Sequence, residues 1–146
     1  MKTISTSVFF VLFTFFSISQ IYEVEFGNHF GFNSGKQTSY EEIIKEENML
    51  YKEFNPSRIN KYVFDLDNKE INLFYDGIFV GKEKILSVRT KGELLFFTIS
   101  DEEALTNKKI ESHIVINQNE ENKSYPRFTL YFISTVDGTS NGFLAF

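Results

Sequence analysis

The sequence predicts a mainly β fold, an antiparallel meander that forms a small barrel or sandwich, with one N-terminal α-helix packed on it. Three observations predict this class: short segments in which apolar and polar residues alternate, turns rich in glycine, asparagine and aspartate between them, and a single helix-start signal ahead of them. Short strands joined by close turns favour antiparallel neighbours and a meander.

Residues 1–19 have the three parts of a secretory signal peptide. Lys2 supplies the early positive charge, an apolar run extends from Val8 to Ile18, and Ser17 and Ser19 give the small-x-small cleavage pattern. A membrane span needs about 20 apolar residues, and this run is shorter. We therefore expect residues 1–19 to be a signal peptide and residues 20–146 to form a single β-rich domain with no membrane insertion after signal cleavage.

The composition excludes several classes of protein. The chain has no cysteine, so a disulfide framework, a lipid-attachment cysteine and Cys-His catalysis are excluded. A cysteine-free exported domain fits a bacterial exporter better than an animal secretory pathway, which indicates a secreted or periplasmic product. The net charge of −5 becomes more negative once Lys2 is removed, and no basic patch is clustered in the sequence, so we expect no nucleic-acid partner.

The region before residue 60 is expected to hold one strand, one loop and one helix. Residues 21–26, IYEVEF, alternate in the manner of a half-buried strand. Residues 27–39, GNHFGFNSGKQTS, carry three glycines without any period and predict a loop. Ser39 and Glu42 then form an SxxE capping box, which predicts a helix over residues 40–54.

From residue 60 onward the pattern is that of β-strands. KYVFDLDNKEINLFYDG, residues 61–77, predicts two strands joined by a turn at Asp67-Asn68 and followed by a type I′ hairpin signal at Asp76-Gly77. The residues expected on the core face of these two strands are Tyr62, Phe64, Leu66, Ile71, Leu73 and Tyr75. Further strands are expected at residues 78–81, 83–90, 93–100, 110–118, 125–134 and 143–146, with turns at residues 91–92, 119–124 and 137–142. Residues 93–100 form a nearly unbroken apolar run, which predicts a strand covered on both faces, with the helix as one cover.

The acidic residues between Asp65 and Asp76 come closest to a metal motif, and their spacing argues against one. In a twelve-residue calcium loop that starts at Asp65, position five would be Lys69 and position six Glu70, where an oxygen ligand and a glycine are required. Turn chemistry of short polar side chains explains the acidic residues without a metal. We therefore expect no metal and no cofactor.

The two histidines, His29 and His113, do not lie in any zinc-site spacing. The alternation of residues 110–117 predicts that His113 lies on a strand surface together with Glu111. No GxSxG elbow marks a nucleophile, although a Ser-His-Asp triad stays possible because its members need not be close in sequence. The sequence therefore assigns no catalytic residue, and a small exported hydrolase-like enzyme is kept as an alternative.

The expected function is a non-catalytic binding or interaction module of the bacterial periplasm or extracellular space. Its most concrete version is an aromatic-lined barrel that carries a small apolar ligand and resembles a lipocalin in architecture only, because the GxW signature requires a tryptophan that the chain lacks. The expected ligand-binding residues are Asn28, His29, Phe30 and Phe32, in the predicted loop that combines glycines with aromatic residues.

Three alternatives remain beside this interpretation. The phenylalanines of the predicted loop could instead close one end of the core, as buried phenylalanine usually does. A protein partner could take the place of the small ligand, and the protein could be a structural component of the cell envelope. The terminal Phe146 resembles the closing strand of outer-membrane barrels, but the strands expected here are mostly too short for the 9 to 11 residues that such a strand needs.

Overall fold

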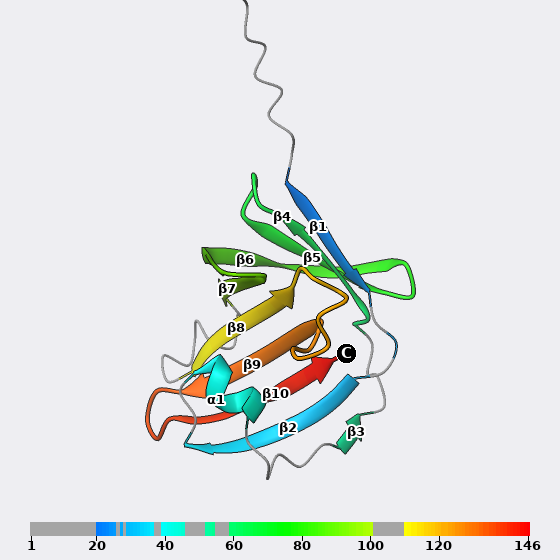
Figure 1. Ribbon diagram of the computed structural model, residues 1–146. Coiled ribbons are helices and arrows are strands. Elements are labelled where there is room, and N and C mark those ends of the chain that lie inside the picture. The colour runs from blue at the N-terminus through cyan, green and yellow to red at the C-terminus, as the bar shows by residue number, and fades with distance from the viewer. Residues whose placement is uncertain are drawn as a thin grey trace, which may run out of the picture.

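One antiparallel sheet of ten strands dominates the computed structural model of the protein (Figure 1). The structure describes residues 20–25, 27, 29–36, 39–45, 52–54, 59–100 and 110–146, with the backbone alone at residues 29–30, 33–36 and 52–54. The strands are β1 (Ile21–Glu25), β2 (His29–Lys36), β3 (Lys52–Phe54), β4 (Lys61–Asp65), β5 (Glu70–Tyr75), β6 (Ile78–Lys91), β7 (Leu94–Ser100), β8 (Ile110–Asn117), β9 (Phe128–Ser134) and β10 (Thr139–Ala145), and the helix is α1 (Tyr40–Lys45).

The strand order in the sheet is β1-β4-β5-β6-β7-β8-β9-β10-β2-β3, so the strands from β4 to β10 form an uninterrupted meander. The two N-terminal strands attach at opposite ends, β1 to β4 and β2 to β10. Figure 1 shows that the sheet curls like half a barrel. The predicted mainly β, antiparallel meander is confirmed, in the form of a single curled sheet and not of two sheets packed as a sandwich.

Strand β6 belongs to two ladders. Its first half, up to Lys84, pairs with β5, and its second half, from Lys84 to Lys91, pairs with β7. The register shifts between Ile85 and Ser87, which is a β-bulge, and bulges bend a strand and increase its twist. The two strands predicted at residues 78–81 and 83–90 are therefore one strand of 14 residues.

The predicted hairpin of residues 61–77 is confirmed. In β4 and β5, Tyr62 pairs with Leu73 and Phe64 with Ile71. The carboxylate of Asp65 accepts hydrogen bonds from the backbone N–H and the side-chain amide of Asn68, at 3.0 and 2.8 Å, which closes the turn. The next turn has positive φ at both Asp76 (46°) and Gly77 (79°), as a type I′ turn requires. Of the predicted core residues, Leu66 is only partly buried and Tyr75 is 40% exposed.

The inner core fills the concave side of the curled sheet. The rings of Phe64 on β4 and Phe97 on β7 lie 4.6 Å apart, because the curl brings these strands face to face. The buried members of the inner core are Val24, Tyr62, Phe64, Ile71, Leu73, Ile85, Leu95, Phe97, Ile99, Ile114, Ile116, Phe128 and Ala145. Apolar burial on this scale is the main stabilising contribution to the fold.

A second, helix-side core covers the opposite face of β7 to β10. Tyr40 of α1 meets the ring of Phe96 on β7 edge to face, with the centroids 5.5 Å apart. The buried members of this core are Phe32, Tyr40, Ile43, Leu94, Phe96, Val115, Tyr131 and Leu144. The prediction that β7 is covered on both faces is confirmed. The helix on one of those faces is only six residues long and is not the predicted helix of residues 40–54.

The predicted helix over residues 40–54 is wrong in extent. Its start is confirmed: the Ser39 N–H donates to Glu42 at 3.1 Å, and the Glu42 N–H donates to the Ser39 hydroxyl at 3.2 Å. The helix ends at Lys45, and residues 52–54 form β3, which pairs with β2. Strand pairing with β2 therefore overrides the local helical preference at the end of the predicted helix.

The predicted loop at residues 27–39 is also wrong, because residues 29–36 form β2 between β10 and β3. Likewise, the predicted turn over residues 137–142 extends only to Asp137 and Gly138, and β10 begins at Thr139. The predicted signal peptide at residues 1–19 lies outside the described residues. Among those that are described, no helix is long and apolar enough to span a membrane.

Candidate functional site: a pocket between α1 and the sheet

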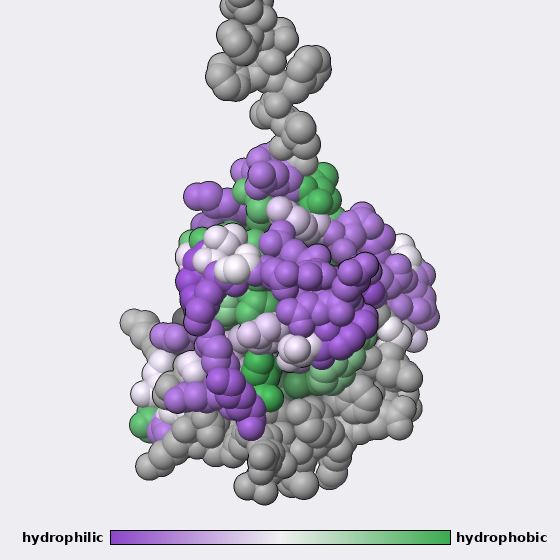
Figure 2. All heavy atoms as spheres, in the orientation of Figure 1, coloured by the Kyte–Doolittle hydropathy of each residue, from purple (hydrophilic) through white to green (hydrophobic). Residues whose placement is uncertain are grey.

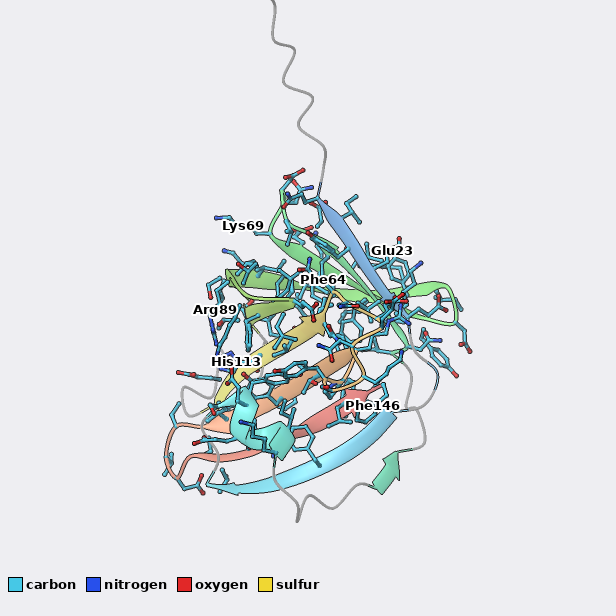
Figure 3. All side chains as sticks on the ribbon, viewed as in Figure 1. Glu23, Phe64, Lys69, Arg89, His113 and Phe146 are labelled. Carbon is cyan, nitrogen blue, oxygen red and sulfur yellow. The ribbon has the colours of Figure 1, made fainter. Side chains whose placement is uncertain are left out.

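A pocket of about 230 Å³ lies where the start of α1 meets the edge of the helix-side core. Its walls come from five elements. The lining residues include Ser39 just before α1, Glu41 in α1, Ser87 and Arg89 on β6, Phe96 and Thr98 on β7, Glu111 and His113 on β8, and Tyr131 on β9. Figure 3 shows Arg89 and His113 near each other at the end of the sheet beside α1. The pocket is therefore a polar break in an otherwise apolar face.

The register of the sheet aligns these side chains. Ser87 pairs with Thr98, Thr98 with His113, and His113 with Tyr131, so the four form one row across β6 to β9. Directly paired residues of antiparallel strands project from the same face of the sheet. One row of the ladder thus presents two hydroxyls, an imidazole and a phenol to the pocket.

His113 is held on three sides. Its ring stacks on Tyr131 with the centroids 5.0 Å apart, Nε2 lies 3.3 Å from Oε2 of Glu111, and Nδ1 lies 3.5 Å from the Thr98 hydroxyl. Burial lowers the pKa of His113 below its usual value, and the hydrogen bond to Glu111 opposes this shift only in part. His113 lies on the predicted face of its strand, but α1 partly covers that face, so the side chain is only 19% exposed.

Arg89 lies at the rim of the pocket. The central carbon of its guanidinium lies 4.0 Å from the centroid of the Phe96 ring, a cation–π contact. No carboxylate of the described residues lies within 4 Å of this guanidinium. The neighbouring Lys91 differs, because its ammonium lies 2.7 Å from Glu41 and its hydrogen bond lowers the pKa of Glu41. Arg89 is thus a positive charge at the pocket that makes no ion pair within 4 Å among the described residues, although it contributes with Lys91 to lowering the pKa of Glu41.

The two tyrosines of the pocket are neutral over the physiological range. Burial raises the pKa of Tyr131 to about 12, and it raises the pKa of Tyr40 further. Tyr40 stacks on Tyr131 with the centroids 6.4 Å apart, so both rings form a flat apolar wall. With a neutral imidazole beside them, the pocket offers aromatic surface, hydrogen-bonding groups, the guanidinium of Arg89 and the carboxylates of Glu41 and Glu111.

Of the predicted ligand-binding residues, only Phe32 has a described side chain, and it is not among the residues that line this pocket. Asn28 lies outside the described residues, and His29 and Phe30 are backbone positions of β2 that pair with β3. Phe32, whose side chain is described, is 5% exposed and packs in the helix-side core. The pocket residues Arg89, Thr98 and Tyr131 were missed, since only the strand register brings them to His113.

The pocket holds two carboxylates and one imidazole, those of Glu41, Glu111 and His113. In the part of the chain that the structure describes, no three His, Asp or Glu side chains gather as metal ligands. Glu41 and Glu111 both line the pocket; Glu41 forms an ion pair with Lys91, whereas Glu111 is hydrogen-bonded to the neutral His113 and keeps its negative charge. No protein-family model matches the chain, and neither a curated protein nor a solved structure matches it.

Proposed function

We propose that the protein is an exported, non-catalytic binding module that holds a small planar carboxylate in the pocket beside α1. The observation that carries this proposal is Arg89, a guanidinium without a carboxylate partner among the described residues, stacked on Phe96 next to the His113–Tyr131 pair. A planar guanidinium matches the geometry of a carboxylate with two parallel hydrogen bonds. The carboxylate would lie at the rim, on Arg89.

The walls of the pocket favour a flat apolar body behind that carboxylate. Tyr40, Phe96 and Tyr131 supply aromatic surface, while Thr98 and His113 supply hydrogen-bonding groups. The volume of about 230 Å³ is below the range of roughly 300–1,000 Å³ typical of drug-sized ligands, so the ligand would be about the size of a single substituted ring. Lys91 offsets the charge of Glu41, so Arg89 is the group of the pocket that would bind an anion, and the carboxylate of Glu111 opposes it in part.

This site differs from the interior of a lipocalin-like barrel, where a purely apolar ligand would be carried. The concave side of the curled sheet is occupied by the inner core, with Phe64, Phe97 and Phe128 each at most 1% exposed. We therefore assign the ligand to the helix-side pocket, and we assign it an acidic group as well as an apolar part.

The test uses a matched pair of probes, benzoate and its uncharged analogue benzamide. In two-dimensional NMR titrations we expect benzoate to shift the resonances of Thr98, His113 and Tyr131, and benzamide to bind more weakly. Arg89→Gln removes the positive charge at the rim. It should weaken the binding of benzoate about two- to fivefold, the range for an exposed ion pair, and leave the binding of benzamide unchanged.

Arg127→Gln is the matched control. Arg127 pairs with Glu120 at 3.1 Å and is absent from the lining of the pocket, so its loss removes the same charge elsewhere. Benzoate affinity should not change in this variant. If benzoate and benzamide bound equally, or if the two arginine variants behaved alike, the carboxylate site would be wrong.

Export is the second part of the proposal, and it has its own measurement. It rests on the lysine, apolar run and small-x-small pattern of residues 1–19. Mass spectrometry of the protein recovered from a bacterial host should show a mature N-terminus at Gln20 in the periplasm or the medium. A full-length chain that remains in the cytoplasm would contradict export and would leave the pocket proposal to its own test.

A hydrolase is the second candidate, and one specific contact favours it. The Thr98 hydroxyl, His113 and Glu111 form a chain at 3.5 and 3.3 Å, which has the order of nucleophile, base and orienting carboxylate. A neutral imidazole is the form that accepts a proton from a hydroxyl.

Hydrolysis of p-nitrophenyl acetate separates the two candidates. An enzyme would lose its rate in both Thr98→Val and His113→Gln, because each removes one member of the chain. A binding module would give the same low rate in the wild-type protein and both variants, and this is the result that we expect.

A further inference from the structure

Glu111 brings a second charge to the pocket, opposite in sign to that of Arg89. It lies on β8 two residues before His113, so both side chains project from the same face of the strand. Oε2 of Glu111 lies 3.3 Å from Nε2 of His113, and burial lowers the pKa of that imidazole, which is therefore neutral under physiological conditions. No lysine or arginine nitrogen of the described residues lies within 4 Å of Glu111, so its negative charge is not offset.

The other carboxylate of the pocket, that of Glu41, is in a different state. Its Oε1 lies 2.7 Å from the ammonium of Lys91, which neutralises its charge locally. Glu111 is thus the carboxylate of the pocket that is available to a positively charged group from outside the chain.

The strand register places Arg89 and Glu111 at opposite ends of the pocket. Arg89 pairs with Phe96 on β7, and Phe96 pairs with Val115 on β8, so Glu111 lies two strands across and four residues along from Arg89. In a flat sheet this offset separates the two Cα atoms by roughly 17 Å, a distance that the two long side chains shorten.

The ring of Tyr131 experiences both charges. Burial raises its pKa most, the charge of Arg89 lowers this pKa, and the charges of Glu41 and Glu111 raise it. Opposite charges therefore act on the same aromatic wall without forming an ion pair with each other.

We propose that the ligand of this pocket is a zwitterion, a planar ring with a carboxylate at one end, bound by Arg89, and an ammonium group at the other end, bound by Glu111. This inference rests on the proposed carboxylate site and adds a second recognition group to it. An ammonium donates up to three hydrogen bonds and so can bind a carboxylate that already accepts one from an imidazole. The separation of Arg89 and Glu111 favours charges at opposite ends of the ring over charges on one carbon atom.

The setting of the two charges also suits such a ligand. Arg89 and Glu111 are both exposed, while Tyr40 and Phe96 supply apolar wall between them. Figure 2 shows a described surface that is largely hydrophilic, with smaller apolar areas. Charged groups at an exposed rim keep most of their hydration, so each contact is expected to contribute as much as an exposed ion pair.

The test compares 4-(aminomethyl)benzoate with 4-ethylbenzoate, which carries a methyl group in place of the ammonium. Glu111→Gln removes the charge and keeps an oxygen that accepts the hydrogen bond of His113. In calorimetric titrations this variant should bind 4-(aminomethyl)benzoate about two- to fivefold more weakly, since one exposed ion pair is lost. It should bind 4-ethylbenzoate slightly more tightly, because the repulsion between two carboxylates is lost.

Glu120→Gln is the matched control. The Glu120 side chain is 68% exposed, against 59% for Glu111, and it pairs with Arg127 away from this pocket. The ratio of the two dissociation constants should not change in this variant. An unchanged ratio in Glu111→Gln, or an equal change in Glu120→Gln, would refute the ammonium site.

Benzylamine, which has no carboxylate, separates this inference from the carboxylate site. Its binding should weaken about two- to fivefold in Glu111→Gln and should not weaken in Arg89→Gln. If benzylamine depended on Glu111 and benzoate did not depend on Arg89, the carboxylate site alone would be wrong. If benzoate depended on Arg89 and benzylamine did not depend on Glu111, the ammonium site alone would be wrong.

Discussion

The two faces of the central strands β7 to β10 serve different purposes, although the same strands build both. The inner face is closed and apolar, with Phe97 and Ile114 almost completely buried in the inner core. The helix-side face is apolar in the helix-side core, and where the start of α1 meets that core it carries Thr98 and His113. Phe97 and Thr98 are neighbours in the chain, but side chains alternate between the two faces of a strand. Phe97 therefore packs in the inner core, and Thr98 lines the pocket.

The largest expected effect concerns the inner face. Phe97→Ala should lower the free energy of unfolding by about 3–5 kcal/mol, because it leaves a cavity against Phe64. Phe79→Ala is the matched control, with the same change at an exposed ring, and should alter stability by less than about 0.5 kcal/mol. Urea unfolding measured at low protein concentration gives both values. Similar losses in the two variants would mean that the inner core is not the main source of stability.

The next largest effect on the free energy of unfolding is expected at Gly142, where β10 lies close against β9. A Cβ on Gly142 would collide with the carbonyl oxygen of Leu130 and lie 2.7 Å from Cα of Tyr131. Gly142→Ala should therefore destabilise the protein by about 1–3 kcal/mol, as overpacking does. Gly81→Ala, at an open position of β6, should be neutral or slightly stabilising, and equal effects in urea unfolding would contradict the close approach.

A smaller effect is expected at the start of α1. Ser39→Ala removes the hydroxyl that accepts the Glu42 N–H, and should lower the free energy of unfolding by about 1 kcal/mol. Because α1 forms one wall of the pocket, the same variant should also weaken benzoate. Ser124→Ala, at an exposed turn position, is the control for both measurements. A change in stability with no change in benzoate affinity would show that α1 does not contribute to benzoate binding.

The smallest expected effect is a dependence of the free energy of unfolding on pH, caused by His113. Its pKa is lowered in the folded state, so the unfolded chain takes up the proton first as the pH falls. The wild-type protein should therefore lose stability relative to His113→Gln as the pH falls below the usual value of 6.5 toward the folded pKa, and the difference should be constant above pH 6.5. Urea unfolding of both proteins at several pH values measures this difference. A difference that grows as the pH rises would show that the pKa is raised instead.

The regions compared above also differ in how well the sequence alone predicts them. The Ser39 cap, the Asp76-Gly77 turn and the alternation in β4 and β5 were predicted correctly, because each depends on residues close in the chain. Strand β2 was missed because its partner β10 lies about a hundred residues away, and long-range pairing overrides local preference. Local patterns therefore predict the meander but not the strands at its end.

The pocket was missed for the same reason. The sequence places His113 and Glu111 on one face of a strand, which is correct. It does not show that Thr98 and Tyr131 pair with His113 on either side, since that depends on the register of three strands. The signal that was present, a histidine and a glutamate two residues apart in an apolar strand, was interpreted as ordinary surface. Because α1 partly covers this face, the histidine and the glutamate line a pocket and do not lie on an open surface.

The bulge in β6 decides which side chains reach the pocket. Ile85 pairs with Ile99 and is buried in the inner core, whereas Ser87 pairs with Thr98 and lines the pocket, because one extra residue lies between the two pairs. Without that extra residue Ser87 and Arg89 would face the inner core, since a shift of one residue turns every following side chain to the other face of the sheet.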